Sequence, residues 1–143
     1  MLAVGLALFA LPTAGQAANL SSAGAYLAGS LDRNGCAHER GGTASANLSA
    51  WVAFGLVSAG RSASGPADCI ERHARRLTTV TDLEVATLAL VAAGRNPRNA
   101  GGRDLVKAIR SSLRRGRIGT LVASNQFGIL ALKAAGAPIP AAA

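Results

Sequence analysis

Residues 47–60 read NLSAWVAFGLVSAG, and segments of the same kind recur as DLEVATLALVAAG at 82–94 and as NQFGILALKAAG at 125–136. Each segment opens on polar residues, continues through small apolar residues and closes on a glycine. Aligned on that glycine, the large apolar residues fall into three columns: Trp51, Val85 and Phe127; Phe54, Leu88 and Leu130; Leu56, Leu90 and Leu132. A unit repeated in this way buries its apolar face against its neighbours, so the pattern predicts a helical repeat architecture.

Three other segments have the spacing of amphipathic helices. Residues 19–31, 68–77 and 104–113 carry apolar residues three and four positions apart, which places them on one helix face. The glycine-closed segments are apolar almost all round and therefore need burial on most sides. No segment shows a convincing strand alternation. We expect an all-α domain of about six helices in three hairpins, arranged as an inner and an outer layer.

The expected helix ends carry residues that suit them. Gly60, Gly94 and Gly136 each close a segment and are expected to adopt the left-handed conformation that ends many helices. Asp68 and Asp104 are expected at helix starts, where a carboxylate accepts free backbone N–H groups and suits the helix dipole. These ends divide the chain into the predicted hairpins.

The composition of the 143-residue chain suits one helical domain. Half of the residues are hydrophobic but only 3% are aromatic, so the apolar content is mostly Ala, Leu and Val. The net charge of +8 is carried mainly by Arg, and we interpret the stripe Lys107, Arg110, Arg114 and Arg117 as a solvated cationic surface. Weak attraction to anionic cell-envelope material is the alternative. Without interleaved aromatic residues, the stripe does not predict nucleic-acid binding.

The first 17 residues have the pattern of a signal peptide. They are apolar from Leu2 to Leu11 and end with small residues, Gly15 and Ala17, at the expected cleavage positions. The apolar core is too short to span a bilayer as a stable anchor. No Lys or Arg precedes it, so a buried first helix is the alternative. We expect a secreted or cell-envelope protein with a repeat domain over 19–137 and a frayed tail over 138–143.

The chain has two cysteines, Cys36 and Cys69, and an even number in a short exported chain favours one disulfide. Such a bond closes a loop of about 30 residues and stabilises the fold by about 3–4 kcal/mol. A zinc site is the sharper alternative, because His38 and His73 follow the two cysteines at short spacings and could complete four ligands. Two unpaired buried thiols are the third.

Polar residues gather where the glycine-closed segments begin, and such starts collect on one rim of a layered helical repeat. Thr81 and Glu84 have the spacing of a capping box, and we interpret most of the rim as helix caps. For a ligand site on this rim, the residues we expect to bind are Trp51, Glu84 and Gln126. The pattern predicts no catalytic residue, no metal ion and no cofactor.

The paired helices, with inner helices of the form apolar-Ala-Leu-x-Ala-Ala-Gly, resemble the α/α toroid of prenyltransferase and squalene–hopene cyclase (terpenoid cyclase) repeat proteins. Residues 31–36, LDRNGC, stand where that family usually has a Gln-x-x-Asp-Gly loop after an outer helix. Residues 95–102, RNPRNAGG, are similar to the linker between its units. The resemblance covers residues 20–137 and implies a partial toroid, since a closed one needs about twice as many helices.

The chain departs from that family where the family's chemistry resides. Its cyclases use an Asp-x-Asp-Asp cluster, whereas the aspartates here stand singly as Asp32, Asp68, Asp82 and Asp104. Its cyclases also line a cavity with aromatic rings, of which this chain has few. Its protein prenyltransferases hold zinc with Asp, Cys and His, whose composition but not spacing is matched by Asp68, Cys69 and His73.

These observations favour an exported, non-catalytic repeat protein that binds a small molecule or a protein through its concave face. The first alternative is an enzyme remnant or half-toroid that completes a barrel as a homodimer. The second is a small-molecule carrier, because the toroids of cobalamin-transport proteins are similar. The sequence names no ligand for any of these functions.

Overall fold

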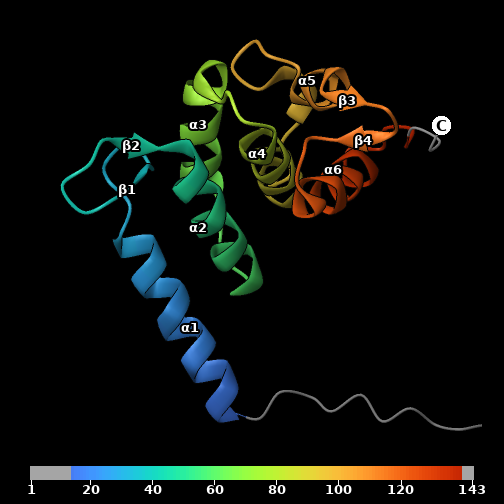
Figure 1. The fold of residues 1–143 in the computed structure, drawn as a ribbon. Coiled ribbons are helices and arrows are strands. Elements are labelled where there is room, and N and C mark those ends of the chain that lie inside the picture. The colour runs from blue at the N-terminus through green and yellow to red at the C-terminus, as the bar shows by residue number, and fades with distance from the viewer. Residues whose placement is uncertain (1–13, 140–143) are drawn as a thin grey trace, which may run out of the picture.

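The computed structural model describes residues 14–139, with side chains from residue 19 onward. This part of the chain is mostly helical (Figure 1). Its α-helices are α1 (Ala14–Gly29), α2 (Ala46–Ser58), α3 (Ser64–His73), α4 (Val80–Ala92), α5 (Leu105–Ser111) and α6 (Val122–Ala134). The 3-10 turns η1 (Ala74–Arg76) and η2 (Pro97–Asn99) precede α4 and α5. The structure supports the predicted all-α class.

Two predicted segments fall wholly or partly outside the described residues. Of the predicted signal peptide, residues 1–13 lie outside them, and residues 14–17 belong to α1. Of the predicted tail, residues 140–143 lie outside them. Within residues 14–139, no helix combines the length and the apolar character that crossing a bilayer requires.

The three glycine-closed segments form α2, α4 and α6, and all three helices end in the same way. Gly60, Gly94 and Gly136 have φ angles of 67°, 72° and 61°. The residue after each glycine donates its N–H to a carbonyl five positions earlier, from Arg61 to Leu56, Arg95 to Leu90 and Ala137 to Leu132, each at 2.8 Å. This is the Schellman motif, so the predicted left-handed helix ends are confirmed.

Helices α2, α4 and α6 form a row with α4 in the middle (Figure 1). Helix α3 packs against α2 and α4, and α5 packs against α4 and α6. Helix α1 projects away from the others and packs on α2. Leu56, Leu90 and Leu132, one column of the aligned repeat, are buried together with Ile70 of α3 and Ile109 of α5. The core therefore lies between the row and the two helices that cover it.

Two short antiparallel ribbons were not predicted. Strands β1 (Ala37–His38) and β2 (Ala44–Ser45) pair before α2, and β3 (Leu113–Arg114) and β4 (Arg117–Ile118) pair before α6. Each strand has two residues, which is too few for the alternation that identifies a strand in a sequence. The turn between β3 and β4 has positive φ angles at Arg115 (50°) and Gly116 (74°), as tight hairpins require.

The structure also corrects several predicted helix boundaries. The helix expected over 19–31 is α1, which covers Ala14–Gly29, and the one expected over 104–113 ends at Ser111. Asp104 does cap that helix, since it accepts the N–H of Lys107 at 2.8 Å. Asp68 does not begin a helix, because α3 starts four residues earlier and Asp68 pairs with Arg95 at 2.5 Å. An ion pair to the next helical unit replaces the expected cap.

Candidate functional site

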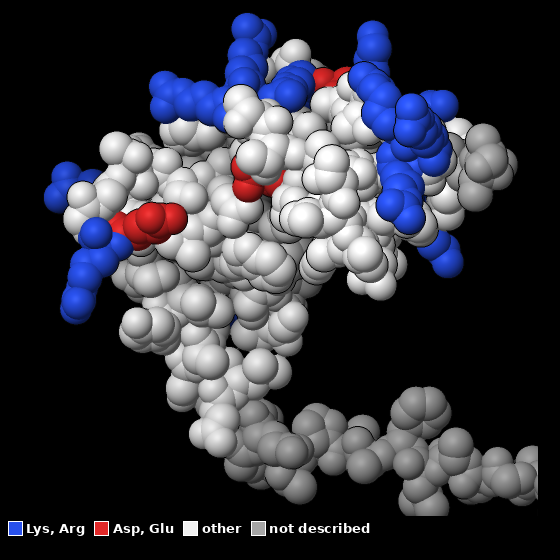
Figure 2. Space-filling model, viewed as in Figure 1, with Lys and Arg blue, Asp and Glu red and all other residues white. Residues whose placement is uncertain are grey.

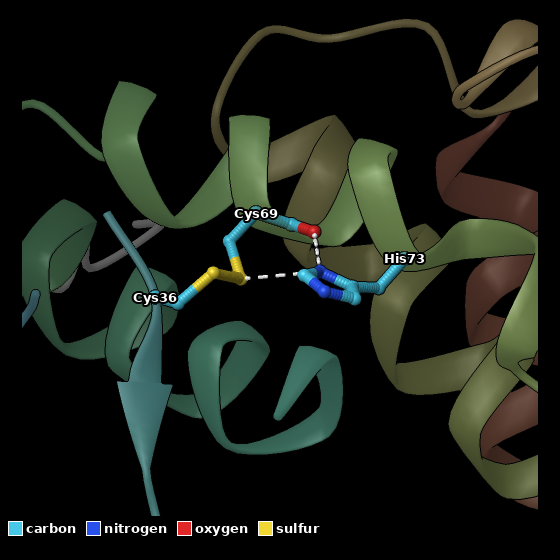
Figure 3. A group of neighbouring side chains, drawn as sticks. All are labelled: Cys36, Cys69 and His73. Carbon is cyan, nitrogen blue, oxygen red and sulfur yellow. Dashed lines mark hydrogen bonds between the residues drawn. A yellow bond between two sulfur atoms is a disulfide. The ribbon is translucent and has the colours of Figure 1, made fainter. Parts of the chain in front are cut away.

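Cys36 and Cys69 are joined by a disulfide, as predicted (Figure 3). The two residues are 33 positions apart in sequence, and their Cα atoms are 5.2 Å apart. Cys36 directly precedes β1 and Cys69 lies within α3, and both are fully buried. A disulfide of this kind indicates an oxidising, extracytoplasmic environment.

The turn before Cys36 holds it against α3. Gly35 has a φ angle of 72°, and a Cβ atom at that position would lie 2.5 Å from the carbonyl carbon of Gly65. Asp32 Oδ1 accepts the N–H groups of Asn34 and Cys36, both at 2.8 Å. Only a residue without a side chain permits this approach, so Gly35 and the Asp32 turn together set the position of the disulfide.

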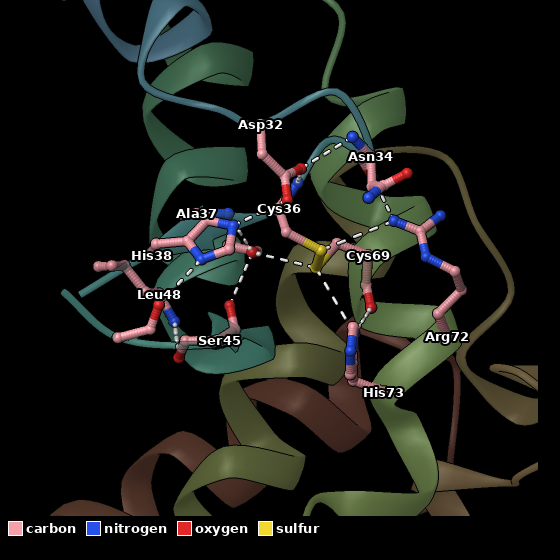
Figure 4. The surroundings of a disulfide bond; sticks show 12 residues. Asp32, Asn34, Cys36, Ala37, His38, Ser45, Leu48, Cys69, Arg72 and His73 are labelled. Carbon is pink, nitrogen blue, oxygen red and sulfur yellow. Dashed lines mark hydrogen bonds and ion pairs between the residues drawn. A yellow bond between two sulfur atoms is a disulfide. The ribbon is translucent and has the colours of Figure 1, made fainter. Parts of the chain in front are cut away.

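Hydrogen-bonding groups from α2 and α3 lie beside the two sulfur atoms (Figure 4). Arg72 of α3 donates to Cys36 Sγ at 3.6 Å and also to the carbonyl of Asn34. The Ser49 hydroxyl of α2 lies 3.4 Å from Cys69 Sγ. It donates to the Ser45 carbonyl at 2.7 Å and accepts the N–H of Ala37 in β1 at 2.9 Å. The disulfide is therefore a junction of β1, α2 and α3. Sequence reasoning missed Arg72 and Ser49, because only tertiary packing brings them to the cysteines.

The four residues of the zinc alternative do not form one ligand set in this oxidised structure. Ligand atoms of Cys36, Cys69 and His73 lie within 4.8 Å of one another, but the two sulfurs are bonded to each other (Figure 3). His73 Nδ1 lies 2.9 Å from the carbonyl oxygen of Cys69 and bonds its own helix. His38 Nε2 instead lies 2.8 Å from Asp32 Oδ2. In the oxidised chain, Cys36 and Cys69 therefore have a structural role as a disulfide.

His38 and Asp32 form a partly exposed ion pair beside the disulfide. The hydrogen bond to His38 lowers the pKa of the Asp32 carboxyl, and the N–H of Cys36 lowers it further. The same hydrogen bond to Asp32 raises the pKa of the His38 imidazole, and the carbonyl of Gly42 adds to this effect. Both shifts favour the charged forms, and the pair links the β1–β2 ribbon to the Asp32 turn.

Large apolar side chains reach the surface on the row of α2, α4 and α6. Trp51 is 49% exposed and packs edge-to-face on Phe54, with ring centroids 5.7 Å apart. Leu130 of α6, which occupies the place of Phe54 in the repeat, is 54% exposed, and the equivalent Leu88 of α4 is partly buried. Phe54, Leu88 and Leu130 occupy one column of the repeat, and Trp51 packs on the first of them. We call Trp51, Phe54, Leu88 and Leu130 the apolar face.

Glu84 lies in the contact between α4 and α6 and is fully buried. Neither of its carboxylate oxygens has a hydrogen-bond partner, and the same holds for the hydroxyl of Thr87 one turn further along α4. Burial raises the pKa of Glu84 to about 7. A buried carboxyl without partners favours its neutral form, because ionisation would leave an unsolvated charge in the core.

The three residues expected to bind a ligand do not share one open surface. Trp51 is exposed on the apolar face, and Gln126 is exposed beside Asn125 in a pocket of about 240 Å³ near the start of α6. Glu84 is buried in the core. Its place in the sequence resembled a rim position, and only the packing of α6 against α4 covers it.

The polar residues at the helix starts bond to one another. Thr79, rather than Thr81, caps α4: its hydroxyl accepts the N–H of Asp82 at 3.1 Å and donates to the Asp82 carboxylate at 2.6 Å. Asn47 donates to Asp82 at 2.6 Å, and Thr81 Oγ1 lies 3.2 Å from Ser124 Oγ. The capping box predicted for Thr81 and Glu84 is therefore wrong, because α4 begins two residues earlier and Thr79 is its cap. The rim links α2, α4 and α6.

Comparison of this chain with models of protein families, with curated proteins and with solved structures finds no match.

Proposed function

We propose that this chain is an exported, non-catalytic helical repeat module that binds an apolar ligand on the apolar face. The observation that carries the proposal is the exposure of two large apolar side chains, Trp51 on α2 and Leu130 on α6, by 49% and 54%. Side chains of this size and kind on neighbouring helices are typical of a binding surface. In the proposed arrangement, the row of α2, α4 and α6 is the inner layer of a partial α/α toroid, and α3 and α5 belong to its outer layer.

The partners of the aspartates support a non-catalytic role. Asp32 bonds His38, Asp68 pairs with Arg95, Asp82 bonds Thr79 and Asn47, and Asp104 caps α5. Each of these carboxylates therefore bonds a group of the same chain and has a structural role. A general acid needs a side chain that faces the substrate. Three acids in residues 14–139 bond no other side chain: Glu84 is enclosed in the core, Glu71 is partly buried on α3, and Glu39 is exposed after β1.

The single tryptophan of the chain provides the test, because Trp51 belongs to the apolar face. Titration with farnesol, an apolar alcohol, should shift the Trp51 emission to shorter wavelength in a saturable way. Leu130→Asp should weaken this binding about tenfold or more, because it places a charge where apolar surface is buried. Tyr26→Asp is the matched control, since Tyr26 is 77% exposed on α1, outside the apolar face. A shift that does not saturate, or equal losses in both variants, would contradict the proposal.

A homodimer that closes a barrel through the same face is the second candidate, and the same exposed side chains favour it. Light scattering distinguishes the two functions. A dimer that Leu130→Asp converts to a monomer supports closure by a second copy, whereas a monomer that binds farnesol supports the ligand site.

Export is also part of the proposal, supported by the disulfide and by the pattern of residues 1–17. Mass spectrometry of protein collected from outside the producing cells should give a chain that begins at Ala18. A mature mass that retains Met1 would contradict export by a cleaved signal peptide.

A further inference from the structure

A second candidate site is a pocket that lies outside the apolar face. It has a volume of about 630 Å³, within the range of small-molecule sites, and is formed by η2, α5, the start of β3 and the segment after α6. Its lining residues are Arg98, Asp104, Val106, Lys107, Arg110, Ser111, Leu113, Pro138 and Ile139. The lining residues come from separate segments between Arg98 and Ile139, so the pocket depends on the tertiary fold.

The polar part of the pocket is cationic and lacks counter-ions. Arg98, Lys107 and Arg110 are exposed, and no carboxylate in residues 14–139 forms an ion pair with any of them. The one acid in the lining, Asp104, uses its carboxylate to cap α5. Lys and Arg gather along the upper edge of the molecule, over α3, α5 and β3 (Figure 2). The pocket opens within this cationic region and carries two net positive charges of its own.

The remaining lining is apolar. Val106 is fully buried, Leu113 is partly buried, and Ile139 is 47% exposed. The pocket therefore places apolar side chains beside cationic ones. An amphiphile with an anionic head satisfies both halves, because its head neutralises the cations and its chain covers the apolar residues.

We infer that this pocket binds the phosphate headgroup of an anionic membrane lipid. Guanidinium groups bind phosphate oxygens in a forked geometry, and the pocket offers two of them, Arg98 and Arg110, with Lys107 as a third donor. A phosphate monoester carries nearly two negative charges at neutral pH, which balances the pocket. The first part of the lipid chain lies on Leu113 and Ile139. The site is independent of the apolar face, so either site can fail without the other.

Co-sedimentation with vesicles tests the site. The protein should sediment with phosphatidylcholine vesicles that contain phosphatidic acid and stay in solution with phosphatidylcholine alone. The double variant Lys107→Gln, Arg110→Gln should lower the partition coefficient about tenfold or more, since each basic residue contributes severalfold to binding at an anionic surface. The matched control is Arg33→Gln, Arg40→Gln, which removes the same charge from exposed residues near β1. It should change the partition coefficient less than threefold.

The apolar half of the site has its own variant. Ile139→Asn keeps every charge and should lower the partition coefficient severalfold, because it removes apolar contact with the lipid chain. If binding were only electrostatic attraction to an anionic surface, this variant would bind like the wild type. Thermal melting of each variant shows that it is folded. Three results would overturn the inference: no sedimentation with phosphatidic acid, equal losses in the two double variants, or full release by inorganic phosphate at unchanged ionic strength. The last result would assign the pocket to free phosphate.

Discussion

The carboxylate of Glu84 lies against the backbone of Gly128, so closely that a Cβ atom at position 128 would stand 2.9 Å from Glu84 Oε1. The same Cβ atom would stand 2.8 Å from two carbon atoms of Ile118. Both distances are shorter than side chains tolerate. The absent side chain at Gly128 is therefore what allows α6 to close over Glu84 in α4, and with it over the middle of the row.

Gly128→Ala should destabilise the fold by about 1 to 2 kcal/mol, because the forced movement of Ile118 and Glu84 outweighs the gain in helix propensity. Urea denaturation measures this difference. Gly29→Ala is the control, since a Cβ atom at the end of α1 meets nothing within 4 Å. Equal stability of the Gly128 and Gly29 variants would show that α6 packs less closely on α4 than the structure describes.

The free energy of unfolding should depend on pH through Glu84. Its pKa is about 7 in the folded chain against an ordinary value of 4.5, so the folded state binds the proton more tightly. The stability that Glu84 contributes is complete below pH 4.5 and is lost as pH rises to 7, by about 3 kcal/mol. Glu84→Gln has no such proton, so its stability should exceed that of the wild type increasingly over this range.

The comparison of two variants isolates this effect in urea denaturation at several pH values. Glu39→Gln removes an exposed carboxyl and should leave the pH dependence of the wild type unchanged. Parallel curves for wild type and Glu84→Gln between pH 4.5 and 7 would show that water reaches the carboxyl and that α4 and α6 do not enclose it.

The disulfide should contribute about 4 kcal/mol to stability, because it closes a loop of 33 residues in the unfolded chain. The double variant Cys36→Ala, Cys69→Ala should lose about this amount in denaturant unfolding. A phosphine reductant should destabilise the wild type similarly and leave the double variant unaffected. If the reductant also destabilised the double variant, the loss of stability in the wild type could not be assigned to the Cys36–Cys69 bond.

Asp32→Asn should lower the pKa of His38, because the amide cannot stabilise the imidazolium as the carboxylate does. The ion pair contributes above the lowered pKa of Asp32 and below the raised pKa of His38, and is lost outside that interval. NMR titration of the His38 ring protons measures the change. His73 is the only other histidine, and its resonances should not respond to the substitution. An unchanged His38 titration would contradict the pairing.

Local chemistry made much of the fold predictable. The glycines at 60, 94 and 136 end their helices in left-handed conformations, and the leucines four residues earlier enter the core, as their recurrence suggested. Asp104 caps its helix by the same local rule. The cysteines were few enough that one disulfide was the simplest pairing. The helix ends depend on residues a few positions away, and the disulfide prediction depended on the number of cysteines.

The candidate sites were less predictable, because exposure depends on what packs from elsewhere. Trp51 and Glu84 both seemed suited to a rim, yet one is on the surface and the other is sealed by Gly128 of α6. The basic residues Lys107 and Arg110 of α5 were predicted to form a solvated stripe. Their sequence neighbourhood did not indicate that Arg98 and Ile139 would line a pocket with them.

By itself the sequence determined that this chain is helical and where its inner helices end, since backbone conformation and apolar periodicity are local properties. It favoured one disulfide over the two alternatives, and the structure decided between them. Tertiary structure alone decided which column of the repeat is buried and which reaches water, that Glu84 loses its solvent, and that cations and apolar residues from distant segments share a pocket. The physical reason is that burial and the electrostatics it controls are set by the close approach of helices far apart in the chain, which a periodic pattern does not encode.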